Sequence, residues 1–381
     1  MVQTSGRGHY SWSRVKGCGA APPPCCCHTL VPYHEKLILF GGAIFGRCFN
    51  DVYVFDLRTD SWHLMRPLND EIAYPRMSHS SVLYKDMMVV FGGMNNNGTL
   101  ADMIALDLTT FSWSSVHHVG EVHPGPKRSH AAAVYKDKMY VLMGRPEYPQ
   151  PDLWSFDFSS RQWKFIRLAQ QWGRPPVALH GHSVCVEGCV MYVFGGASMQ
   201  QTGSTAYFND LHTYDFERNQ WTRVDIVGAR PTPRYAHAMG VVCGKLFIHG
   251  GDADQCRTYF DDLWVLDTKQ ETPQWFDVTN VASRPSRRSG HAYCVSQGSL
   301  YIFGGEAPCD NDHVFYSGGL YKLPLSLPLA APLADLAARW LSRCVSVRES
   351  DLDSICSNAA LLLFRYLPCG DEEILSGPHA L

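Results

Sequence analysis

Short apolar segments alternate with polar turns along most of the chain, and the stretch around residue 90 shows the pattern clearly. Two five-residue segments, 80–84 and 87–91, are separated by a polar two-residue turn, which is typical of a β-hairpin. A loop rich in asparagine and glycine follows, then an apolar segment over 102–108 and another that contains Trp113. Four short strands in succession predict one four-stranded antiparallel sheet.

The same unit recurs six times, and each copy begins with a histidine and continues through a strand that ends near a glycine pair. The histidines, spaced roughly 50 residues apart, are His28, His79, His130, His182, His237 and His291. The pairs are Gly41-Gly42, Gly92-Gly93, Gly195-Gly196, Gly250-Gly251 and Gly304-Gly305, with Gly144-Arg145 as the degraded pair of the third repeat. A repeat of this length with a glycine pair and a tryptophan resembles the blade of a kelch-type β-propeller.

The tryptophans indicate how such a ring would close. Five repeats contain a tryptophan after the third strand, but the repeat that begins at His291 does not, and Trp12 precedes the first repeat. We therefore predict an all-β, six-bladed kelch β-propeller over residues 1–323, in which the N-terminal segment supplies the outer strand of the last blade. Closure of this kind removes the free sheet edges that an open array would expose.

The pattern changes after Lys322. A proline-rich segment leads into apolar residues at steps of three and four, which predict amphipathic helices. A second helix is expected to begin near Ser350, where Asp353 stands three residues on as in a capping box. Residues 324–381 are therefore predicted to form a C-terminal helical tail.

Composition narrows the partners and the compartment. A formal net charge of −3 gives no reason to expect nucleic acid or a membrane surface as a partner. The start of the chain lacks an apolar core typical of a secretory signal, so we expect the protein in the cytoplasm, with the nucleus as a further compartment. Most of the 14 cysteines are then expected as free thiols.

Catalytic motifs are missing from the sequence. It contains no glycine-flanked nucleophilic serine, no phosphate-binding loop and no cysteine spacing typical of zinc. We therefore predict that the protein is not an enzyme and holds no metal or other cofactor. Each repeat histidine is expected to satisfy a buried hydrogen bond within its own blade.

Cationic residues recur just before the repeat histidines. The set consists of Arg76, Lys127, Arg128, Arg234 and Arg288. This pattern resembles the kelch substrate receptors, in which arginines at this position line the mouth of the propeller and hold acidic or carboxylate-bearing peptides. The alternative is that each cation pairs locally with the aspartate that starts a third strand, such as Asp102. Two aromatic residues in the loops after the glycine pairs, Tyr207 and Tyr259, are further candidates for the mouth.

The tail resembles the elongin-binding box of cullin-2 substrate receptors. The matching residues are Leu333, Ala337 and Leu341, and the pair Leu367-Pro368 falls where such receptors have their cullin-binding segment. A second candidate box lies at Leu352, Cys356 and Ala360. The resemblance implies an adaptor that binds elongin B/C and cullin-2 and captures a peptide or a protein C-terminus. The alternative is a kelch interaction scaffold, cytoskeletal or trafficking, with a structural tail.

Overall fold

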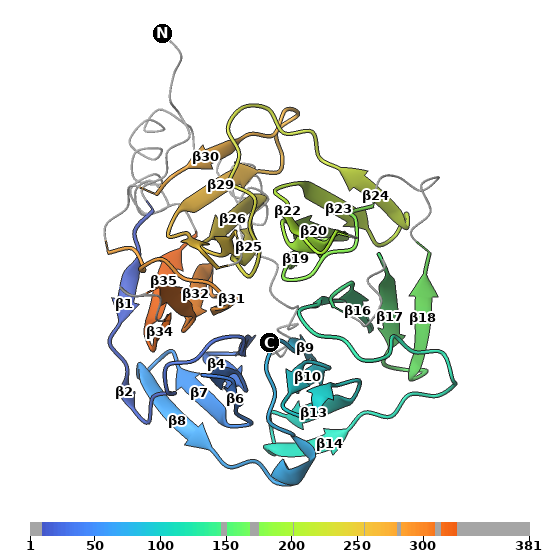
Figure 1. Cartoon of the computed structure of the whole chain (residues 1–381). Coiled ribbons are helices and arrows are strands. Elements are labelled where there is room, and N and C mark those ends of the chain that lie inside the picture. The colour runs from blue at the N-terminus through green and yellow to red at the C-terminus, as the bar shows by residue number, and fades with distance from the viewer. Residues whose placement is uncertain are drawn as a thin grey trace, which may run out of the picture. The chain divides into compact units, whose positions relative to one another are not determined.

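The computed structural model of the chain describes residues 10–145, 151–167, 175–200, 202–254, 256–279, 283–308 and 314–325. These residues form six antiparallel sheets arranged around a central axis, which Figure 1 shows from one end of the axis. Each sheet is one blade of a β-propeller, and its first strand lies nearest the axis. The predicted six-bladed propeller is confirmed.

The first three blades follow the chain order. Blade 1 consists of β3 (Thr29–Tyr33), β4 (Lys36–Phe40), β7 (Val52–Asp56) and β8 (Ser61–Met65). Blade 2 consists of β9 (Ser80–Tyr84), β10 (Met87–Phe91), β13 (Met103–Asp107) and β14 (Ser112–Ser115). Blade 3 consists of β15 (Ala131–Tyr135), β16 (Lys138–Leu142), β17 (Leu153–Asp157) and β18 (Gln162–Ile166).

The last three blades repeat the arrangement, and the sixth borrows a strand. Blade 4 consists of β19 (Ser183–Glu187), β20 (Val190–Phe194), β23 (Leu211–Asp215) and β24 (Gln220–Arg223). Blade 5 consists of β25 (Ala238–Val242), β26 (Lys245–His249), β29 (Leu263–Asp267) and β30 (Trp275–Asp277). Blade 6 consists of β31 (Ala292–Ser296), β32 (Ser299–Phe303), β35 (Leu320–Pro324) and β1 (Ser13–Val15).

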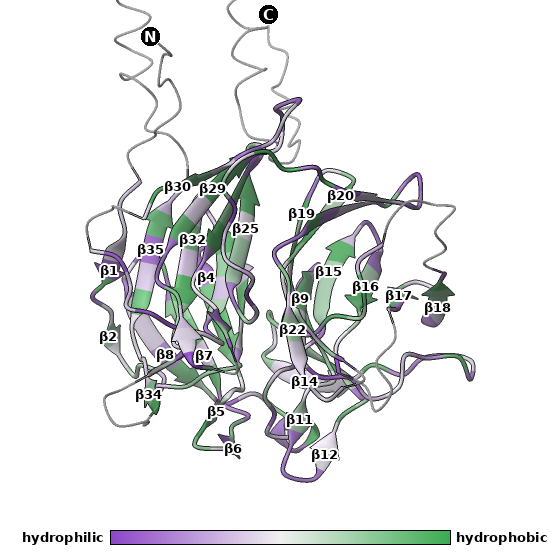
Figure 2. Ribbon diagram, turned by 45° about the horizontal axis from the view of Figure 1, so that its top comes forward, coloured by the Kyte–Doolittle hydropathy of each residue, from purple (hydrophilic) through white to green (hydrophobic). Residues whose placement is uncertain are grey.

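Small hairpins extend five of the blades beyond their second and third strands. They are β5 (Ala43–Ile44) with β6 (Arg47–Cys48), β11 (Met94–Asn95) with β12 (Gly98–Thr99), β21 (Ala197–Met199) with β22 (Thr205–Tyr207), β27 (Asp252–Ala253) with β28 (Thr258–Tyr259), and β33 (Glu306–Pro308) with β34 (Val314–Tyr316). Figure 2 shows β5, β6, β11 and β12 projecting from one end of the propeller, which we call the mouth face.

Two further elements lie at the outer edge. The short strand β2 (Cys18–Gly19) pairs in parallel with β8, and the 3₁₀ helix η1 (Asp70–Ile72) precedes blade 2. Within the described ranges no helix is long and apolar enough to cross a membrane.

The N-terminal segment closes the ring as the sequence predicts. In β1, Ser13 lies opposite Lys322 and Val15 opposite Leu320 of β35. The Trp12 side chain is only 2% exposed, and its ring lies 5.0 Å from the His249 ring of blade 5. This tryptophan therefore occupies the position between blades that the sixth repeat lacks.

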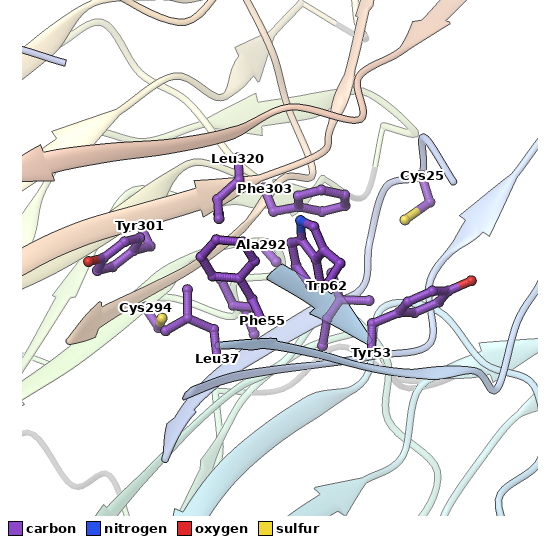
Figure 3. Packing of buried hydrophobic residues seen from close by; sticks show 12 residues of the cluster. Cys25, Leu37, Tyr53, Phe55, Trp62, Ala292, Cys294, Tyr301, Phe303 and Leu320 are labelled. Carbon is purple, nitrogen blue, oxygen red and sulfur yellow. The ribbon is translucent and has the colours of Figure 1, made fainter. Parts of the chain in front are cut away.

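Aromatic rings hold each blade on the next. Figure 3 shows the contact between blades 6 and 1, where Trp62 packs at 5.2 Å from Phe303 and 4.9 Å from Phe55. Equivalent pairs of a phenylalanine with the tryptophan of the next blade are Phe40 with Trp113, Phe91 with Trp163, and Phe194 with Trp275. These offset and edge contacts contribute about 0.5–1.5 kcal/mol each beyond the buried area.

The glycine pairs make room for histidines on both sides. Gly41 and Gly42 have φ values of 68° and 97°, where a side chain would be strained. A Cβ on Gly41 would lie 2.8 Å from the ring of His79 in the next blade, and one on Gly42 would lie 2.7 Å from the Cβ of His28 in the same blade. Each pair thus lets two blades approach closely.

In the third repeat, the predicted position of the degraded glycine pair is wrong by one residue. Gly144 has φ 104°, and a Cβ there would lie 2.7 Å from the Cβ of His130, which is the environment of a second glycine. Met143, with φ 49°, takes the place of the first glycine. The degraded pair is therefore Met143-Gly144, and Arg145 is the first residue after it.

The predicted hydrogen bond of each repeat histidine within its own blade is wrong for five of the six. Two of the histidines bond to the preceding blade, and among the described residues neither ring nitrogen of His182, His237 or His291 has a hydrogen-bond partner. His79 shares a hydrogen bond of 2.9 Å with Thr29 of blade 1, and His130 one of 2.8 Å with Ser80 of blade 2. Burial lowers the pKa of His130 to about 3 and that of His28 to about 4, so both rings are neutral at pH 7.

The residues immediately before the six histidines form a closed ring around the axis. They are Cys27, Ser78, Ser129, Gly181, Ala236 and Gly290, and all have left-handed φ values. The backbone N–H of each donates to the carbonyl of its counterpart in the preceding blade, at 2.7–3.0 Å. We call this hydrogen-bonded circle the axial ring. It separates the mouth face from a central channel lined by the histidines.

The predicted tail over 324–381 lies almost entirely outside the described residues, which end at Leu325. The helices, the elongin- and cullin-binding residues and the second candidate box therefore stay predictions, as does the boundary between propeller and tail.

Candidate functional site

A cavity of about 400 Å³ opens on the mouth face, and the axial ring forms its floor. The residues on its walls include Met94, Arg128, Arg145, His180, Tyr207, Tyr235, Ser289 and Glu306. Of the sequence-predicted mouth residues, Arg128 and Tyr207 line this cavity.

A repeated backbone bridge positions these side chains. In every blade the residue two before the histidine pairs with the first residue after the glycine pair. In blade 3 these residues are Arg128 and Arg145, and the N–H of Arg145 donates to the Arg128 carbonyl at 2.8 Å. The other bridges are Cys26 with Ala43, Met77 with Met94, His180 with Ala197, Tyr235 with Asp252, and Ser289 with Glu306. The repeat therefore places two arginines side by side on one wall.

This pair, which we call the basic wall, has no carboxylate partner within the described ranges. Arg128 donates to the thioether sulfur of Met94, a weak acceptor. Burial and the charge of Arg145 lower the pKa of Arg128, which shows that the two cations repel each other. Burial, followed by the two arginine charges, lowers the pKa of His180 to about 4, so His180 is neutral at pH 7. Within the described ranges the basic wall therefore presents two positive charges to the cavity with no carboxylate against them.

Carboxyl groups gather on the other side of the mouth. Glu306 lines the cavity and accepts a hydrogen bond of 3.6 Å from the Cys26 thiol. Behind it, Asp252 is fully buried and accepts a hydrogen bond from the Ser289 hydroxyl. Burial raises the pKa of Glu306 and raises that of Asp252 to about 7, and the Glu306 charge adds to the latter shift. We call Glu306 and Asp252 the acidic wall.

Two predicted mouth arginines lie elsewhere. The Arg76 guanidinium is fully buried and donates to both carboxylate oxygens of Asp102, at 2.9 and 2.7 Å. Arg234 is buried in the same way and donates to Asp262 at 2.6 and 2.7 Å. Each also donates to the carbonyl of the first glycine of its own repeat, Gly92 for Arg76 and Gly250 for Arg234. For these arginines the local pairing with a third-strand aspartate is therefore the correct alternative.

The other two cations of the set are buried as well. Lys127 donates to Asp152 at 2.6 Å. Arg288 has no carboxylate partner among the described residues, but it donates to the Gly304 carbonyl and to the Ser317 hydroxyl. Since both side chains are only 1% exposed, they tie blades together and do not line the mouth.

Asp51 and Asp210, which precede the third strands of blades 1 and 4, are also paired with a cation. The equivalent residues three before the histidine in the first and fourth repeats are uncharged, Cys25 and Leu179. Asp51 and Asp210, which would be their partners, pair instead with an arginine that follows or lies in the fourth strand of their own blade, Arg66 and Arg223. Each aspartate at this position, where described, therefore has a cation.

Tyr259 does not reach the cavity. It is 5% exposed and lies opposite Asp252 in the β27–β28 hairpin. Sequence reasoning missed Arg145, Tyr235 and Glu306. The signal that would have found them is positional: all three occupy one of the two bridge positions that also place Arg128.

The described residues contain no group of three side chains with the arrangement of a metal site. Their ten cysteines are all free thiols, in agreement with the expectation from the sequence.

Comparison with known proteins identifies the family. The family model described as the KLHDC2/KLHL20/DRC7 Kelch-repeats domain matches residues 7–196 and 166–321. The chain therefore belongs to this kelch-repeat family. Kelch domain-containing protein 3 of Homo sapiens is 26% identical over 301 residues, which cover 74% of this chain and 77% of that protein.

Other relatives share only a part of their length. Acyl-CoA-binding domain-containing protein 5 of Arabidopsis thaliana is 31% identical over 242 residues, covering 60% of this chain and 36% of that protein. The leucine-zipper-like transcriptional regulator 1 homolog of Drosophila melanogaster is 28% identical over 343 residues, covering 85% of this chain and 33% of that protein. The chain thus spans about a third of the length of these two relatives.

Proposed function

We propose that this kelch-repeat protein is a non-enzymatic substrate-recognition adaptor of a cullin-2 ubiquitin ligase, and that its mouth captures a peptide or a protein C-terminus. The observation that carries the proposal is the basic wall. Two adjacent arginines face a cavity of about 400 Å³ without a carboxylate partner in the described structure. Membership of the kelch-repeat family supports a protein-binding role.

The chemistry of the wall favours a carboxylate ligand. A guanidinium group donates two parallel hydrogen bonds to one carboxylate, and these charge-assisted bonds are about twice as strong as neutral ones. The two guanidinium groups repel each other, so an anion between them removes an unfavourable interaction as well. Because the axial ring closes the floor, a ligand enters from the open end only, which favours the end of a chain over its middle.

The last described residue, Leu325, lies at the end of blade 6 that is remote from the mouth. The N–H of Leu325 donates to the carbonyl of Gly298, in the turn between β31 and β32. That turn lies at the end of blade 6 remote from the glycine pair and the mouth. The described part of the chain therefore ends on the face opposite the cavity.

The finer resemblance concerns the segment after Leu325. The propeller followed by a leucine-rich tail is similar to kelch domain-containing protein 10, and this similarity implies elongin B/C and cullin-2 as partners. No cofactor, metal, nucleic acid or membrane partner is included in the proposal, and the proposed compartment is the cytoplasm, with the nucleus as a second one.

Affinity capture from cell extract tests the adaptor role. The full chain should retain elongin B/C and cullin-2, and a chain without residues 324–381 should not. In the proposed box, Leu333→Asp places a charge where an apolar pocket should receive leucine, so elongin capture should be lost. The matched control is Leu352→Asp in the second candidate box. If elongin capture is lost only with Leu352→Asp, the second candidate box is the one that binds elongin. If the unmodified chain captures no elongin, the interaction-scaffold alternative takes the place of the adaptor role.

An array of C-terminal peptides tests the mouth. Peptides with a free carboxylate should bind, and the same peptides with a C-terminal amide should not. Arg145→Gln should weaken binding by roughly 1.5–3 kcal/mol, the contribution of a charge-assisted hydrogen bond. The control is Arg66→Gln, which alters an exposed ion pair outside the cavity. Equal binding of acids and amides would show that the ligand is not a terminal carboxylate.

A further inference from the structure

The mouth has charges of opposite sign on facing walls. The basic wall belongs to blade 3, and Glu306 of the acidic wall belongs to blade 6, three blades further around a ring of six. Figure 1 shows these blades on opposite sides of the axis. Both Arg145 and Glu306 line the same cavity. A ligand that fills the mouth therefore meets both walls.

The acidic wall has no cation of its own. Within the described ranges neither Glu306 nor Asp252 forms an ion pair. One carboxylate oxygen of Asp252, Oδ2, is buried and has no hydrogen-bond partner in the part of the chain that the structure describes. Among the described residues, the side-chain donor to Glu306 is the thiol of Cys26, which is a weak donor. Buried carboxyl groups are normally paired, because leaving one unpaired costs free energy. This wall is therefore arranged to receive a cation.

Aromatic rings connect the two walls along one side of the cavity. The Tyr235 ring lies 6.2 Å from the His180 ring and 5.7 Å from the Tyr207 ring. Tyr235 also forms the backbone bridge to Asp252, so the row begins beside the basic wall and ends beside the acidic wall. Apolar stems of long basic side chains pack well on such rings while their charged ends reach a polar group.

We infer that the mouth selects a chain end that has charges of both signs: the terminal carboxylate against Arg128 and Arg145, and a lysine or arginine side chain a few residues upstream against Glu306. This inference rests on the proposed capture of a C-terminus and adds a specificity-determining residue to it. Glu306 would reject an acidic side chain at the same place, since like charges in a half-buried site repel.

Matched peptides test the inference on the full chain. The probes are fluorescein-labelled peptides of glycine and serine with a free C-terminal carboxylate. Each contains lysine at one of the last four positions, and a partner peptide contains glutamine there. At one or two positions lysine should bind at least tenfold tighter than glutamine, measured by fluorescence anisotropy. Glu306→Gln should bring the two affinities to within about twofold of each other, mainly by weakening the lysine peptide, whereas Arg145→Gln should weaken both peptides and preserve their ratio.

Two controls separate selectivity from general effects. Asp254→Asn removes an exposed carboxylate from the turn of the β27–β28 hairpin and should change neither affinity. Thermal melting of each variant shows whether the propeller stays folded. Equal affinities for lysine and glutamine peptides at every position, or a lysine preference that survives Glu306→Gln, would overturn the inference and leave the proposed function standing. If no peptide of any pair binds the unmodified chain, or if Arg145→Gln binds every peptide as tightly as the unmodified chain does, the proposed function fails and the inference fails with it.

Discussion

Arg234 is a test of whether the buried cations stabilise the ring or serve the ligand. Its guanidinium makes two hydrogen bonds to Asp262, a third of 2.9 Å to the Gly250 carbonyl, and lies 4.2 Å over the Phe260 ring. Trp264 donates to the same carboxylate at 2.7 Å. Arg234→Ala removes the cation and leaves the carboxylate and the carbonyl without it.

The expected loss of stability is large. Removing one partner of a buried ion pair costs about 3–5 kcal/mol, because the other charge stays buried and uncompensated. The Asp262 side chain is 21% exposed, so partial hydration places the cost near the lower end of that range. A domain is stable by only about 5–15 kcal/mol, so this single change should remove a substantial fraction of the total. The melting temperature should fall by roughly 5–10 °C.

Urea unfolding followed by tryptophan fluorescence measures this loss. The matched control is Arg223→Ala, which breaks the exposed pair with Asp210 and should cost at most about 1 kcal/mol. The double variant with Asp262→Ala should recover part of the loss, because it removes the unpaired charge. If Arg234→Ala melts like the unmodified protein but no longer binds peptide, the structural role assigned to Arg234 would be refuted.

Three shorter predictions concern closure, packing and pH. Deleting residues 1–16 should lower the melting temperature by several degrees and promote aggregation, because it exposes an edge of blade 6 and removes Trp12 from the core; an unchanged melting curve would contradict the observed closure. Gly92→Ala should destabilise strongly in the same assay, since a Cβ there would lie 2.5 Å from the backbone oxygen of Lys127, whereas alanine at the open Gly188 should cost far less. The pKa of His28 is lowered to about 4, below its unfolded value of about 6.5, so its contribution to stability is complete above pH 6.5 and is lost as the pH falls toward 4. Urea midpoints should therefore decrease between pH 7 and pH 5, and a constant midpoint would show that the buried rings accept protons without cost.

The architecture could be predicted from the sequence because its determinants are local and repeated. A glycine pair, a histidine and a tryptophan mark each blade, and the displaced Trp12 indicated which segment closes the ring. The roles of the cations could not be predicted in the same way. Arg76 and Arg128 both stand within three residues of a repeat histidine, yet one is fully buried and the other lines the mouth.

The deciding interactions are distant along the chain. Arg76 is buried because its backbone is hydrogen-bonded to Phe49 and Gly42 of blade 1 while its guanidinium group reaches Asp102 of blade 2. The sequence shows that such an aspartate exists, but the direction of the arginine side chain depends on how adjacent blades are rotated. The axial ring is a further case, since its hydrogen bonds join residues that are far apart in sequence and share only a left-handed backbone.

Blade 3 shows why departures from the repeat are informative. Blades 1, 2 and 4 have uncharged residues at both bridge positions, so the backbone bridge itself needs no charged side chain. Blade 3 has Arg128 and Arg145 at both, and it also replaces the first glycine with Met143. Residues that recur in all blades stabilise the propeller. A residue that occurs in only one blade is not needed for this purpose and can contact a ligand. The acidic wall follows the same logic, because Asp252 and Glu306 are the acidic residues among the bridge positions. The uneven charge of the mouth therefore comes from the bridge positions, where a charged side chain does not disturb the backbone bridges of the propeller.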